Sequence, residues 1–157
     1  MPNADSVYLT RETEFSEKLK ILTPKEKIAL LKDFVEYCEN ALDIKNLPKV
    51  KFVFDRRWAT NLHSFGRYRN GERDVTVYMR NRNMADVLRT LAHELVHHKQ
   101  NELGKLDPDS GKTGSDIENE ANAKAGILMR DFGKEREEIY ESESLKLGNI
   151  LKEIKRK

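Results

Sequence analysis

Hydrophobic side chains recur every three or four residues in three stretches of the chain, which predicts three amphipathic helices over residues 23–41, 83–103 and 115–133. The first starts with Thr23 and Glu26 at capping-box spacing. The second has Asn83 as its N-cap, with Gly104 as the C-cap glycine at its end. The local pattern therefore predicts the start of the first helix and both ends of the second.

Two shorter stretches favour β-strands. Residues 50–54 are β-branched and aromatic, and residues 74–79 alternate in polarity after the turn signal Asn70-Gly71. The other arm of that hairpin is expected within 62–69, and the pattern over 55–70 is otherwise weak. We therefore predict an α+β domain in which a small, twisted, mainly antiparallel sheet packs with the N-terminal helix and the two later helices.

A chain of 157 residues is the size of one domain, so residues 1–157 are predicted to form a single unit. Within it, residues 1–12 are expected to be a loose arm, and a shorter helix is expected near 13–22. Residues 134–157 fit a C-terminal helix and an irregular tail equally well.

Charge, hydropathy and cysteine content together favour one cellular compartment for the protein. The net charge is +2, no window approaches a membrane span, and the N-terminus has no signal-peptide core, so a monomeric cytoplasmic protein without a membrane partner is expected. The single cysteine, Cys38, excludes an internal disulfide and fits a reducing compartment. Residues 55–89 hold eight arginines and four acids. Here a solvated basic face is preferred to a nucleic-acid contact.

The chemistry gathers in the second helix, at His93-Glu94-Leu95-Val96-His97. Two histidines four residues apart share a helix face, so their imidazoles can meet at one metal ion. Glu94 lies one position around the helix, where a carboxylate can take a proton from water instead of binding the metal. The alternative is that both histidines are ordinary polar-face residues. His98 lies about 100° from His97, which favours a supporting or surface role for it.

A third ligand is needed for a catalytic zinc site. Gln100 and Leu103 stand where the metzincin pattern has glycine and histidine, and no histidine follows His98, so a downstream carboxylate remains. The candidates are Asp116, Glu118 and Glu120. Glu118 is preferred because it shares a face with Ala121, Asn122 and Ala125, although Ser115 and Glu118 also have capping-box spacing.

The HExxH stretch followed by Glu118-Asn119-Glu120-Ala121-Asn122 resembles the gluzincin pattern, in which a downstream E-x-x-[AS]-[DN] helix completes the site. Within that clan the chain is similar to small members such as the ImmA/IrrE-type peptidases and related phage-encoded proteins. The resemblance covers residues 74–132. It implies a zincin-like fold, Zn²⁺ held by His93, His97 and Glu118, and Glu94 as general base.

The chain departs from that pattern at Asn122, which stands where many gluzincins have aspartate and should orient the ligand histidine less strongly. Tyr140 and His98 are the candidates for stabilising the oxyanion. If the protein is phage-encoded, it would act in the host cytoplasm or the virion.

The resulting expectation is a zinc metalloendopeptidase that hydrolyses a protein or peptide, which would add as a strand along residues 75–79 at the sheet edge. The alternative is a DNA-associated or repressor-binding regulatory module whose zinc site is structural or vestigial.

Overall fold

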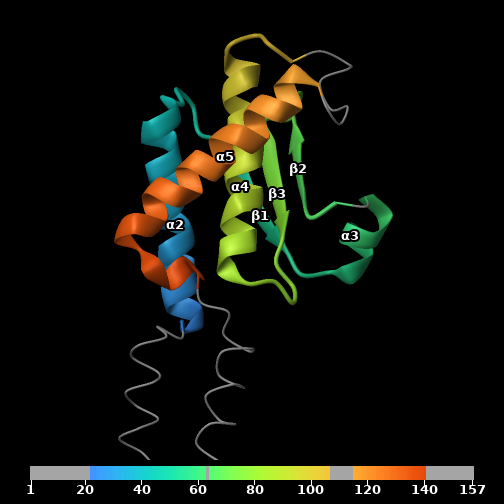
Figure 1. Ribbon diagram of the computed structural model, residues 1–157. Helices are drawn as coiled ribbons and strands as arrows, with labels where there is room; N and C mark the ends of the chain where they lie inside the picture. The colour runs from blue at the N-terminus through green and yellow to red at the C-terminus, as the bar shows by residue number, and fades with distance from the viewer. Residues whose placement is uncertain (1–21, 63, 107–114, 141–157) are drawn as a thin grey trace, which may run out of the picture.

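The computed structural model describes residues 22–62, 64–106 and 115–140. These form four α-helices, a 3₁₀ turn and one three-stranded mixed sheet (Figure 1), which confirms the α+β class. The elements are α2 (Pro24–Leu42), β1 (Lys49–Val53), α3 (Arg56–Leu62), β2 (Gly66–Arg69), β3 (Asp74–Tyr78), α4 (Met84–Glu102), α5 (Asp116–Glu135) and η1 (Glu137–Tyr140). The predicted N-terminal arm, almost all of the helix expected near 13–22, and the C-terminal segment beyond residue 140 lie outside the described residues.

The helix starts follow the predicted caps. Thr23 and Glu26 exchange two hydrogen bonds of 3.2 Å at the start of α2, which is a complete capping box. The Asn83 side chain accepts a hydrogen bond of 2.9 Å from the backbone N–H of Asp86 at the start of α4. After α4 the chain passes through Gly104, whose φ of 70° suits glycine.

The sheet has the order β1-β3-β2, with β1 parallel to β3 and β2 antiparallel to it. The expectation of a mainly antiparallel sheet is therefore wrong, since one strand pair of each kind is present. Helix α3 and strand β2 separate β1 from β3 along the chain, so the connection is long enough for β3 to run in the same direction as β1. Placing residues 75–79 at the sheet edge is also wrong, because β3 is the central strand and all five of its residues are buried.

Helix α3 was not predicted. It has only seven residues, too few for a clear period. A local signal is nevertheless present, because the Asp55 carboxylate accepts a hydrogen bond of 2.9 Å from the backbone N–H of Arg57.

Helix α4 forms the centre of the domain, between the sheet and α5 (Figure 1). Its side chains Leu88, Leu91 and Leu95 are completely buried, as are Val75 and Val77 on the inner face of β3. Helices α2 and α5 pack against α4 and against each other. No helix in the described part of the chain combines the length and apolar character that crossing a membrane requires.

The outer face of the sheet is polar. Asp74 alternates with the inward-facing valines of β3 and is buried beneath charged side chains. Arg69 binds its carboxylate through two hydrogen bonds, one of them 2.8 Å from Nε to Oδ1, and Lys51 Nζ lies 3.4 Å from Oδ2. Together these contacts lower the pKa of Asp74 to about 2, with the Arg69 hydrogen bonds as the main cause.

Candidate metal centre

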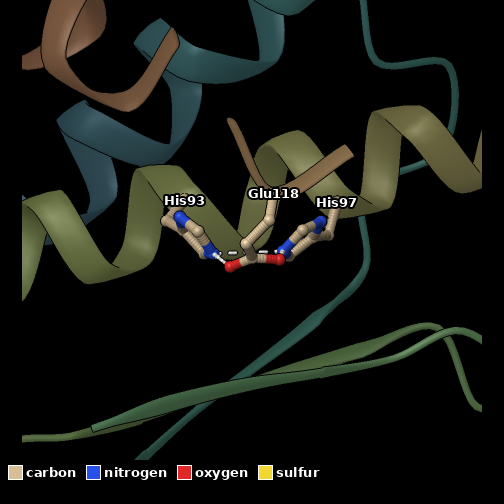
Figure 2. Close-up of side chains that lie close together, drawn as sticks. All are labelled: His93, His97 and Glu118. Carbon is tan, nitrogen blue, oxygen red and sulfur yellow. Dashed lines mark hydrogen bonds and ion pairs between the residues drawn. The ribbon is translucent and has the colours of Figure 1, made fainter. Parts of the chain in front are cut away.

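Three side chains from two helices meet at one point (Figure 2). His93 and His97 lie one turn apart on α4, and their Nε2 atoms are 3.0 Å apart. The Glu118 carboxylate reaches them from α5, with Oε1 at 2.7 Å from His93 Nε2 and Oε2 at 3.1 Å from His97 Nε2. The predicted pair of histidines and the preferred downstream carboxylate are thus brought together.

At the start of helix α5, Glu118 contributes its backbone N–H to the helix cap and its carboxylate to this cluster. The Ser115 side chain accepts a hydrogen bond of 3.2 Å from the backbone N–H of Glu118, so the serine half of the expected capping box is present. The Glu118 carboxylate contacts the two histidines, so its role is not limited to capping the start of α5. Ala121 and Ala125, on the same face of α5, are fully buried and let the two helices lie close together.

The donor set is one that could hold a metal ion. One ligand atom from each of His93, His97 and Glu118 lies within 4.8 Å of the others. Ligand atoms around a tetrahedral zinc ion, about 2.0–2.1 Å from the metal, are about 3.3 Å apart. The observed contacts of 2.7–3.1 Å are shorter than this by about 0.2–0.6 Å, so the side chains would have to move apart by no more than about 0.6 Å.

Each histidine has a hydrogen-bond partner outside the cluster. His97 Nδ1 lies 2.8 Å from Gln100 Oε1, and Asn122 forms a side-chain hydrogen bond with His93. Burial and the neighbouring His97 lower the pKa of His93, against the opposing influence of Glu118. The neutral imidazole that a metal requires is therefore favoured at His93.

Glu94 is 7% exposed, on the side of α4 that faces strand β2. Burial, followed by the charge of Glu118, raises its pKa to about 8. Gly66, the first residue of β2, lies against it, since a methyl group there would come within 3.2 Å of Glu94 Oε1. A cation held by the nearby cluster would favour the ionised carboxylate.

The other candidates lie elsewhere. The Glu120 carboxylate accepts a hydrogen bond of 2.9 Å from Gln100 Nε2, and Asp116 is exposed at the start of α5. His98 is 1% exposed, with Nδ1 2.8 Å from the Tyr68 hydroxyl and Nε2 2.5 Å from the Asn46 carbonyl. A surface role for His98 is therefore wrong, and these contacts leave it unable to serve an oxyanion. The Tyr140 side chain lies outside the described residues.

Strand β2 supplies the sheet edge beside Glu94. The backbone N–H of Tyr78 donates to the Phe65 carbonyl at 2.8 Å, which sets the register of the antiparallel ladder. In an antiparallel ladder, hydrogen-bonded residue pairs alternate with pairs that are not hydrogen-bonded. Because Phe65 and Tyr78 form a hydrogen-bonded pair, the backbone groups of Gly66 and Tyr68 are directed away from β3. The Ser64 hydroxyl contacts those of Gly66.

Gln100 is the residue that sequence reasoning missed. Its position served only to exclude the metzincin pattern, yet its spacing of three from His97 puts the two side chains on neighbouring helix positions. Comparisons with protein-family models, curated proteins and solved structures give no match for this chain.

Proposed function

We propose that this protein is a zinc-dependent metallopeptidase. The observation that carries the proposal is the meeting of His93 Nε2, His97 Nε2 and the Glu118 carboxylate, with the buried Glu94 next in sequence to one of them. Two imidazoles and one carboxylate, with room for a water, are the donor set of many catalytic zinc sites. The resemblance to the gluzincin pattern points in the same direction.

Zinc is the metal that this donor set favours, because imidazole nitrogen suits it better than magnesium or calcium. A bound zinc ion would supply Lewis-acid activation of water and of the scissile carbonyl.

The protein's own residues supply the proton transfer. Glu94 accepts the proton of the attacking water and passes it to the leaving amine. Its burial keeps bulk water away from the carboxylate, and its place beside Glu118 puts it near the three donors. Gln100 and Asn122 hold the histidines in place through side-chain hydrogen bonds.

An extended peptide is the substrate class that the β2 edge fits. Strand β2, and not β3, is an edge strand of the sheet within the described residues and lies next to Glu94, with the backbone groups of Tyr68 directed away from β3. A peptide adding along this edge would form main-chain hydrogen bonds that require little particular sequence. The scissile bond would then pass Gly66, which lies directly against Glu94.

Glu94→Gln tests the function. We expect the variant to keep zinc, measured by metal analysis, while cleavage of unfolded protein substrates falls by about 100-fold or more because the base is lost. Glu72→Gln, at an exposed position in the β2–β3 turn, is the control and should cleave like the wild type. Wild-type activity in Glu94→Gln would refute Glu94 as the base.

The competing function is a DNA-associated or repressor-binding module with a structural metal. The outer sheet face supports it, because Lys51, Arg67 and Arg69 lie there side by side across the strands. Salt-dependent DNA binding that weakens in Arg67→Ala, without proteolysis in a proteome-wide cleavage screen, would favour this module.

A further inference from the structure

Gln100 is one turn from His97 on α4 and is 1% exposed, so each polar atom of its side-chain amide needs a partner inside the protein. It has three. Oε1 lies 2.8 Å from His97 Nδ1, while Nε2 donates to the Ile117 carbonyl at 3.0 Å and to the Glu120 carboxylate at 2.9 Å. The amide therefore links a candidate ligand on α4 to the first turns of α5.

The surroundings of Gln100 decide which way its amide points. The Ile117 carbonyl accepts and cannot donate, and the same is true of the ionised Glu120 carboxylate. If the amide were turned over, its oxygen would face two acceptors, and its nitrogen would face His97. The observed orientation satisfies both N–H groups of the amide.

The orientation of the amide in turn decides the proton position on His97. An amide oxygen can only accept, so His97 Nδ1 must carry a hydrogen to bond with it at 2.8 Å. In a neutral imidazole the other nitrogen, Nε2, then holds a free lone pair. Nε2 is the atom that faces His93 and Glu118 in the cluster.

We infer that Gln100 is a positioning residue, which fixes His97 with its proton on Nδ1 so that Nε2 is available to a metal ion. Glu120 and the Ile117 carbonyl hold the amide in that orientation, so the docking of α5 also sets the state of a ligand on α4. This inference rests on the metal site of the proposed function but not on peptide hydrolysis.

Two variants separate positioning from packing. Gln100→Met fills similar space without an acceptor for His97. The double variant Gln100→Glu/Glu120→Gln exchanges the two groups: the carboxylate at 100 still accepts from His97, the amide at 120 donates to it, and the net charge is unchanged. The Ile117 carbonyl loses its donor in both, so unfolding in urea is measured alongside to follow stability.

The first readout is zinc affinity, measured by competition with a chromophoric chelator. We expect Gln100→Met to bind zinc about 10–100-fold more weakly, as is typical when a partner behind a ligand is lost. The exchange variant should stay close to the wild type. The inference is overturned if Gln100→Met keeps wild-type affinity, or if the exchange variant is as weak as Gln100→Met.

The second readout is the ring-proton position of His97, from long-range ¹H–¹⁵N NMR of the metal-free protein at a pH where the imidazole is neutral. The wild type should show the proton on Nδ1, and Gln100→Met should lose this preference. A wild-type proton on Nε2 would overturn the inference. Because neither readout involves cleavage, a protein that passes both and hydrolyses nothing would defeat the proposed function alone.

Discussion

Gly66 of strand β2 lies directly against Glu94 of helix α4. A methyl group at residue 66 would come within 3.2 Å of Glu94 Oε1 and would overlap Thr90 Cγ2. Thr90 cannot turn away freely, because its hydroxyl donates to the Asp86 carbonyl at 3.0 Å and accepts from Arg82 at 2.7 Å. The space at this end of β2 is therefore closed to any side chain.

Gly66→Ala should accordingly destabilise the fold by about 1–3 kcal/mol, because β2 must move away from α4. Urea unfolding of the metal-free protein measures this. Gly71→Ala is the matched control, since a methyl group there meets nothing within 4 Å. Equal effects of the two substitutions would contradict the close approach of β2 to Glu94.

Glu118→Gln should lower zinc affinity by more than about 100-fold, because a ligand matters more than a residue that only orients one. Glu120→Gln should have a much smaller effect, since its amide oxygen can still accept the hydrogen bond from Gln100. Chelator competition on both variants compares them directly. A larger loss in Glu120→Gln would assign the third ligand to Glu120.

Acid should remove the contribution of Asp74 to stability. Its pKa is about 2 in the folded protein against 3.8 as its ordinary value, so the folded state binds fewer protons. This stabilisation, about 1–2 kcal/mol with partly exposed partners, is complete above about pH 4 and is lost as the pH falls towards 2. Urea unfolding between pH 2 and 5 should show a steeper pH dependence for the wild type than for Asp74→Asn. Parallel curves would contradict the Arg69–Asp74 interaction.

Ala125→Leu should separate the two helices that carry the site. Ala125 is 1% exposed between them, so a larger side chain there should cost about 1–3 kcal/mol in stability and should weaken zinc binding by moving Glu118. Ala123→Leu is the control on the same helix, because Ala123 is exposed. Stability and zinc affinity measured together should fall in the first variant and stay near wild type in the second.

The features that were predictable from the sequence depend on residues close together in the chain. The caps at Thr23, Asn83 and Ser115 are each set within three residues, and the pairing of His93 with His97 follows from one helical turn. Glu118 was the preferred third residue because its helix face was readable from Ala121 and Ala125.

The features that were missed depend on contacts between distant segments. The parallel pairing of β1 with β3 places Val50 beside Val75. The sequence of neither strand indicates whether the two run parallel or antiparallel. The hairpin turn includes Asn70-Gly71 as expected, and the feature that was not expected is its left-handed residue, Arg73, with a φ of 53°. The burial of His98 follows from Tyr68 and Asn46, which lie 30 and 52 residues away.

The three donors of the candidate site come from α4 and α5, which are joined through residues 103–115. An ion bound by all three would therefore also serve as a cross-link that closes this connection. Because a ligand that binds only the folded state shifts unfolding by mass action, metal content and resistance to unfolding should report on the same contact. The stability of the domain to unfolding should therefore show whether a metal ion occupies the site.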